Sequence, residues 1–218
     1  MTIALLTLLH LLIPIYWLGG DLGTYLCGRA VRDMTLSPAE RLFALRLLLN
    51  VDMAPRTALI LTLPTGLTLA AVKGWLPLPG WSLGGAWVAA LIWLSMAWAV
   101  HLRHGPASEG FRKADIAIRY GVMAGLAGTG AAALAGVVPL PFFIALKLLL
   151  LASAIAFGVL VRRQLAPLFP AIAALRAQGA SEATDSAITA TLQKTTRSVF
   201  CIWAIVFIAS FIGLATPL

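Results

Sequence analysis

The sequence is poor in charge. Charged residues make up only 11% of its 218 residues, whereas hydrophobic residues make up 61% and the mean hydropathy is +0.94. A soluble domain usually carries about 25% charged and about 45–50% apolar residues. The composition therefore excludes an ordinary soluble domain. It predicts a polytopic membrane protein whose main partner is the lipid bilayer, folded as a single domain over residues 1–218.

Metal-binding and catalytic motifs are scarce as well. Cys27 and Cys201 are the only two cysteines and have no C-x-x-C spacing, so neither a disulfide nor a zinc site is expected. The five methionines are scattered, which argues against a dedicated copper pathway. There is no glycine-rich phosphate loop, no G-x-S-x-G motif and, within the apolar stretches described below, no pair of carboxylates at close helical spacing. These kinds of catalytic or phosphate-binding site are therefore not expected.

Long apolar stretches dominate the chain instead. A membrane-spanning helix needs about 20 mostly apolar residues. Six stretches qualify, at about 3–26, 52–72, 84–101, 119–138, 141–161 and 198–216. They predict an all-α bundle of six transmembrane helices.

Shorter signals predict two cytoplasmic helical segments between these spans. SPAE (37–40) is a capping box with proline at the first helical position, so a helix is expected over 38–51 and a kink or break near Pro55. A second segment is expected over 170–197. There Gly179 ends one helix and Ser181 begins the helix that continues into the last span.

Basic residues are nearly absent from one set of loops. All but three of the 16 lysines and arginines lie in the segments 27–50, 102–119 and 162–197. The positive-inside rule places these segments in the cytoplasm and both termini outside. This pattern predicts a multi-pass protein of the bacterial inner (plasma) membrane. The net charge of +8 then reflects membrane topology, and nucleic acid is not an expected partner.

Ionisable residues inside the spans are the candidate functional groups, because a charged side chain at mid-bilayer costs about 2.5–3.5 kcal/mol on insertion scales. On the first span, His10, Pro14, Trp17 and Asp21 recur at intervals of four, three and four. This spacing puts them on one helical stripe, which is expected to face the bundle interior.

An inner polar cluster is predicted from Asp21, Asp52 and Arg56. NVDMAPR (50–56) places Asp52 and Arg56 one helical turn apart, in the same cytoplasmic half as Asp21. We expect Asp21 to lie within bonding reach of Arg56, because buried charges are normally paired. Two interpretations stay open, a structural clamp between helices and a proton or substrate relay.

An outer site is predicted from His10 and Lys147. At 1.5 Å per residue each lies roughly 10 Å below the outer surface, so both are expected to border one outward-opening cavity. A neutral imidazole in a membrane is a good metal or heme ligand, and a buried lysine pairs with an anion such as a carboxylate. The alternative is a histidine bonded to a backbone carbonyl and a lysine that reaches to the interface.

A second histidine site is predicted at the cytoplasmic end of WVAALIWLSMAWAVHLRH (87–104). His101 and His104 are either interfacial residues beside tryptophan or ligands of a second, inner heme.

The stretch HLLIPIYWLGG (10–20) resembles the first helix of the CopD/HemJ-like integral membrane proteins. Three further segments are similar to other helices of that group: PRTALILTLPTGLTLAAVKGWLPLPGW (55–81), IALKLLLLASAIAFGVLVRRQLAPL (144–168) and LQKTTRSVFCIWAIVFIASFIGLATPL (192–218). The likeness extends over about two thirds of the chain.

The resemblance implies two different functions. The HemJ side implies a redox protein, or a heme-dependent oxidoreductase, that binds heme b. His10 would then be the axial metal ligand, Lys147 the partner of a heme propionate or substrate carboxylate, and Trp17 part of the pocket wall. The HemJ lysine lies on the helix after the loop matched by 74–85, where this chain has none.

The CopD side implies transport of copper or another small solute. The cluster of Asp21, Asp52 and Arg56 would then be the inner gate. A third alternative is a non-catalytic subunit that anchors a larger complex. A redox partner or a homo-oligomer is expected as a protein partner.

Overall fold

The computed structural model describes residues 1–103 and 109–215, and over these ranges it contains helices and no strands. The helices are α1 (Thr2–Arg32), α2 (Pro38–Val51), α3 (Met53–Val72), α4 (Gly80–Leu102), α5 (Glu109–Leu134), α6 (Phe142–Gln164), α7 (Leu168–Gln178) and α8 (Glu182–Ala215). Six helical stretches, with α2–α3 and α6–α7 each taken as one, are long and apolar enough to cross a membrane. The predicted all-α bundle of six spans is confirmed.

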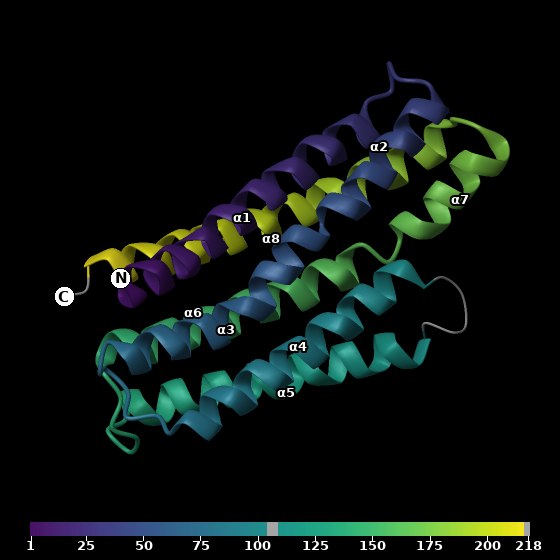
Figure 1. The fold of residues 1–218 in the computed structure, drawn as a ribbon. Coiled ribbons are helices and arrows are strands. Elements are labelled where there is room, and N and C mark those ends of the chain that lie inside the picture. The colour runs from purple at the N-terminus through teal and green to yellow at the C-terminus, as the bar shows by residue number, and fades with distance from the viewer. Residues whose placement is uncertain (104–108, 216–218) are drawn as a thin grey trace.

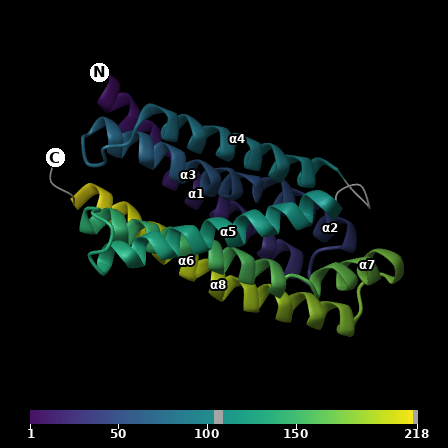
Figure 2. The ribbon, with the colours of Figure 1, turned by 90° about the horizontal axis from the view of Figure 1, so that it is seen from below.

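The six long helices pack in two layers of three. One layer contains α1, α3 and α4, and the other contains α8, α6 and α5 (Figure 2). Across the layers α1 faces α8, α3 faces α6 and α4 faces α5 (Figure 1). The second half of the chain thus adds its helices in the reverse order of the first half. The short helices α2 and α7 occupy corresponding places in the two halves.

The two ends of the bundle differ in composition. The short helices α2 and α7 lie at one end, which we call the basic end (Figure 1). The N-terminus and the turns α3–α4 and α5–α6 lie at the other, which we call the turn end. The basic segments 27–50 and 162–197 therefore lie on the same side, as the charge distribution predicts.

Local signals set several helix boundaries as expected. The Ser37 hydroxyl accepts from the Glu40 N–H, and the Glu40 carboxylate accepts from the Ser37 N–H at 2.8 Å, which completes the capping box. The helix is interrupted at Asp52, so Pro55 falls in the first turn of α3. The N–H groups of a first turn have no partner within the helix, so proline loses no hydrogen bond there. Gly179 ends α7 at φ +82°, a conformation that favours glycine.

The expected start of one helix, α5, differs in the structure, whereas the expected continuous course of α8 is confirmed. Helix α5 begins at Glu109, well before the expected start near residue 119, and ends at Leu134. Helix α8 runs without interruption from Glu182 to Ala215 and joins a predicted cytoplasmic helix to the last span. Its start is capped by Ser181, whose hydroxyl oxygen lies 3.3 Å from the Thr184 N–H.

At the basic end, Arg41 connects three helices by hydrogen bonds. The side chain of Arg41 on α2 is 1% exposed. Its Nε donates to the Val31 carbonyl at the end of α1 at 2.9 Å, and its Nη1 donates to the Asp185 carboxylate at the start of α8 at 2.6 Å. Around it lies an apolar cluster that includes Val31, Ile172, Leu175 and Ile188. Arg41 therefore links three helices through two hydrogen bonds.

The variant Arg41→Ala is expected to lower the free energy of unfolding by about 2–3 kcal/mol, because it leaves a buried carbonyl and a carboxylate without their donor. Chemical unfolding in detergent, followed by circular dichroism, measures the change. Arg46→Ala is the matched control, because that exposed guanidinium on the same helix stacks on Phe43. Equal losses in the two variants would contradict the linking role of Arg41.

Candidate functional site: a cavity between the layers

A cavity of about 210 Å³ lies between the two layers, with walls from α1, α3, α6 and α8. Most of its lining is apolar; the polar and charged members are Thr7, His10, Thr62, Lys73, Lys147 and Ser210. The expectation that His10 and Lys147 border one cavity is confirmed. The two residues come from opposite layers, on α1 and α6.

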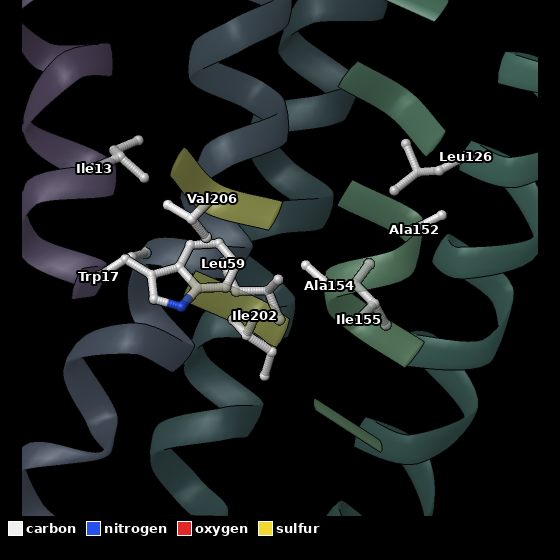
Figure 3. Close-up of a cluster of buried hydrophobic side chains, with 10 residues drawn as sticks. Ile13, Trp17, Leu59, Leu126, Ala152, Ala154, Ile155, Ile202 and Val206 are labelled. Carbon is white, nitrogen blue, oxygen red and sulfur yellow. The ribbon is translucent and has the colours of Figure 1, made fainter. Parts of the chain in front are cut away.

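Close-packed side chains form the floor of this cavity. Ile13 and Trp17 of α1 face Val206 and Ile202 of α8, with Leu59 of α3 between them (Figure 3). Ile13, Trp17 and Val206 belong both to this core cluster and to the cavity wall. Trp17 is 6% exposed. The predicted stripe of α1 thus faces the interior, and an apolar barrier separates the cavity from the basic end.

The ring of His10 is hydrogen-bonded to a threonine of α3. Nδ1 lies 3.0 Å from the Thr65 hydroxyl oxygen. That hydroxyl has a single proton, which it donates to the Leu61 carbonyl at 2.7 Å. With its proton on that carbonyl the hydroxyl accepts from His10, an arrangement in which Nδ1 carries the ring proton and Nε2 keeps its lone pair. The partner is a threonine hydroxyl, so the expected alternative of a backbone carbonyl is wrong.

Two glycines make room for the two ionisable side chains. A Cβ at Gly66 of α3 would lie 3.2 Å from Cε1 of His10, and a Cβ at Gly213 of α8 would overlap Nζ of Lys147. The Lys147 ammonium therefore lies against the backbone of α8. Within residues 1–103 and 109–215 it forms no ion pair. Lys147 is thus a half-buried cation that faces the cavity without an anionic partner among those residues.

A second lysine stands at the mouth of the cavity. Lys73 ends α3, and its Nζ lies 4.6 Å from the centre of the Trp75 ring. Trp75 in turn packs edge-on against Phe143 of α6, with ring centres 5.1 Å apart. No sequence pattern assigned Lys73 to a site. The fold brings it to the same cavity as Lys147.

The expected ion pair between Asp21 and Arg56 is wrong. Arg56 pairs with Asp52, one turn away on the same stretch of chain. Residues four apart on a helix already lie side by side, so this pair forms without the packing of a second helix, which a pair between Arg56 and Asp21 would require. Asp21 is 8% exposed, forms no ion pair within the described ranges, and its Oδ2 accepts no hydrogen bond. The three residues lie in the half of the bundle next to the basic end, but the structure pairs only two of them.

The predicted second histidine site lies apart from the cavity. His101 lies at the end of α4, half-buried, with its ring 5.9 Å from that of Trp98. It is not among the residues that line the cavity. His104 lies outside the described residues.

A buried ionic network that the sequence analysis missed links α4, α5 and α6. The Asp115 carboxylate, 1% exposed, accepts from Trp93 Nε1 at 2.9 Å, from Arg119 Nε at 3.1 Å and from Arg162 Nη1 at 2.7 Å. Arg119 also lies over the Trp93 ring, with Cζ 5.4 Å from its centre. The network lies on the opposite side of the bundle from α1 and outside the cavity lining.

This network has one weak sequence signal. Asp115 and Arg119 are four residues apart, a spacing that pairs charges on a helix. The expected span began at residue 119, which put Asp115 in a loop. The longer α5 places it inside the bundle, where a carboxylate needs partners from neighbouring helices.

Among the residues that the structure describes, no group of three or more His, Cys, Asp or Glu is placed to hold a metal ion. Any metal in the cavity would therefore have His10 as its only ligand of these types. No family model, no curated protein and no solved structure matches the chain. The fold and the cavity define a multi-pass helical membrane protein with an intramembrane histidine and lysine site.

Proposed function

We propose that this protein binds heme b in the cavity between the layers and works as a redox protein of the bacterial inner membrane. His10 would supply the ligand nitrogen, Trp17 would form part of the wall, and Lys147 would pair with a propionate or a substrate carboxylate. Heme supplies one-electron chemistry when bound. The chain supplies the ligand nitrogen, the cations and a dry, apolar wall.

The hydrogen bond from His10 Nδ1 to Thr65 is the observation that carries the proposal. A histidine that ligates a metal through one nitrogen almost always donates its other ring N–H to a fixed acceptor. Here the acceptor would be the Thr65 hydroxyl oxygen, whose own proton is directed to the Leu61 carbonyl. Nε2 is left as a lone-pair donor on a residue that lines the cavity.

The two lysines support a ligand that bears carboxylates. Lys147 and Lys73 both line the cavity, and neither forms an ion pair in the described part of the chain. Two cations at one apolar site match the two propionates of a heme in number and in charge. The volume of about 210 Å³ is below the roughly 300–1,000 Å³ of sites that enclose drug-sized ligands. A macrocycle therefore requires the two layers to move apart when it binds.

The visible absorption spectrum of the purified protein tests the proposal, together with its iron and copper content. A Soret band with about one iron per chain is the expected result. Bound copper without a Soret band would favour the transport alternative. If protein purified after growth with excess heme precursor shows neither a Soret band nor bound copper, the heme proposal is overturned. The remaining alternative is then a non-catalytic subunit that anchors a larger complex.

Small-solute transport is the second candidate, and it is favoured by Asp21. This buried carboxyl group lies one helical turn from Trp17, between the cavity and the basic end, with Oδ2 unpartnered. Buried ionisable groups of this kind mark substrate and ion paths in membrane proteins. If the cavity continues past Trp17 during transport, Asp21→Asn is expected to abolish solute flux in proteoliposomes and to leave any heme spectrum unchanged.

A further inference from the structure

A second pocket, of about 500 Å³, lies at the basic end between the last turn of α1 and the first turns of α8. Its lining includes Leu26, Arg29, Arg32, Asp33, Thr189 and Gln193. We call it the α1–α8 pocket. It shares no lining residue with the cavity between the layers, and nothing in the proposed heme site depends on it.

Two polar atoms of the α1–α8 pocket residues lack partners. Nε of Arg32 and Oγ1 of Thr189 are buried and form no hydrogen bond. Leaving such a group unsatisfied costs about 1–3 kcal/mol, more for a charged group. Both residues line the same pocket from facing helices. Both groups are donors without an acceptor, and an oxyanion that enters this pocket would supply one.

The charge of the pocket is positive. Its one carboxylate, Asp33, accepts from the Thr35 N–H at 2.9 Å and from the Thr35 hydroxyl at 2.7 Å. These hydrogen bonds lower the pKa of Asp33 below its ordinary value and hold the carboxylate in the turn that follows α1. Arg29 and Arg32 outnumber this one acid, and neither forms an ion pair in the part of the chain that the structure describes.

An apolar and aromatic surface continues from the pocket toward the membrane centre. Leu22 and Leu26 of α1 are about half exposed, at 47% and 52%. Beside them Tyr25 packs on Phe200 and Trp203 of α8, with ring centres 5.7 and 6.2 Å away. Aromatic side chains of this kind gather at the level of lipid headgroups. The arrangement is therefore basic at the membrane surface and apolar below it.

We propose that the α1–α8 pocket binds the phosphate of an anionic phospholipid from the cytoplasmic leaflet. Arg29, Arg32 and Thr189 hold the headgroup, and the acyl chains lie along Leu22, Leu26 and Phe200. Basic pockets between membrane helices on the cytoplasmic side suit such headgroups in charge and depth. A lipid bound here joins the first helix to the last, where the two layers meet at one edge.

The proposal is tested by titrating the detergent-purified protein with short-chain phosphatidylglycerol and measuring the bound fraction by native mass spectrometry. Each basic group near an anionic lipid contributes about a fivefold gain in affinity. The double variant Arg29→Gln, Arg32→Gln is therefore expected to bind about 25-fold more weakly. Arg112→Gln, Arg176→Gln removes the same charge from exposed positions at the same end and is expected to bind like the unaltered protein.

Two further measurements test whether the bound phosphate belongs to a lipid and whether Thr189 contributes to binding. Thr189→Val, which keeps the shape of the side chain, is expected to weaken phosphatidylglycerol binding by several-fold. Short-chain phosphatidylcholine and inorganic phosphate are each expected to bind at least tenfold more weakly than phosphatidylglycerol. Equal binding by phosphatidylcholine, competition by inorganic phosphate at similar concentration, or an equal loss in the control double variant would each overturn the lipid site.

Discussion

Replacing His10 by alanine is expected to remove the Soret band of the purified protein while the bundle stays folded. The change deletes the only histidine on the cavity wall among the residues that the structure describes, and with it the lone pair on Nε2 that is expected to ligate iron. Little packing is lost, because the ring is half-buried and faces a cavity. Absorption spectra measure the band, and circular dichroism with size-exclusion chromatography reports the fold.

Two further variants separate ligation from a general effect on the cavity. Thr65→Val keeps the ligand nitrogen but removes the hydrogen-bond partner of Nδ1, and is expected to weaken heme retention by about 10- to 100-fold. His101→Ala changes a histidine outside the cavity lining and is expected to leave the spectrum unaltered. A full Soret band in His10→Ala, or its loss in His101→Ala, would refute the assignment of His10.

Asp115→Ala is expected to lower the free energy of unfolding by about 3–5 kcal/mol, because it leaves two buried guanidinium groups and an indole N–H without their shared acceptor. Asp115 joins three helices at 1% exposure, so the loss is expected to loosen the contacts of α4 and α6 with α5. Chemical unfolding in detergent, followed by circular dichroism, measures it.

The matched control lies on the same helix. Glu109 and Lys113 form an ion pair with the same spacing, but their side chains are 58% and 77% exposed. Glu109→Ala is therefore expected to change stability by only about 0.2–0.5 kcal/mol. Replacing all three charges of the buried network (Asp115→Leu, Arg119→Met, Arg162→Met) is expected to restore most of the stability, since no buried charge is then left unpaired. A large loss in the Glu109 variant would show that helix α5 is sensitive to any change at this end.

The class of the fold and most of its boundaries followed from local chemistry. An apolar stretch of membrane length has to be helical, because its backbone groups have no other partners in lipid. Capping at Ser37, the break before Pro55 and the end of α7 at Gly179 depend on residues within a few positions of one another. The stripe of α1 was also predictable, since helical spacing alone puts His10, Trp17 and Asp21 on one face.

Pairing between helices was not predictable in the same way. Depth in the membrane placed His10 and Lys147 at one level, but only the two-layer packing turned both toward one cavity and added Lys73 to it. Asp21 lost its expected partner because Arg56 pairs with Asp52, one turn away. Asp115 accepts hydrogen bonds from three helices. Of the three donors, only Arg119 is close enough in sequence to be expected from helical spacing.

The sequence by itself determined how many helices there are, where most of them end and which end of the bundle is basic. These properties arise from hydrophobicity, capping and charge along the chain, and each is decided within one or two helical turns. The tertiary structure decided which buried charges are paired, which side chain His10 is hydrogen-bonded to and where the cavities lie. Those properties depend on how helices far apart in sequence are rotated and spaced relative to one another. The packing of small and large side chains sets this arrangement only when all six long helices are assembled.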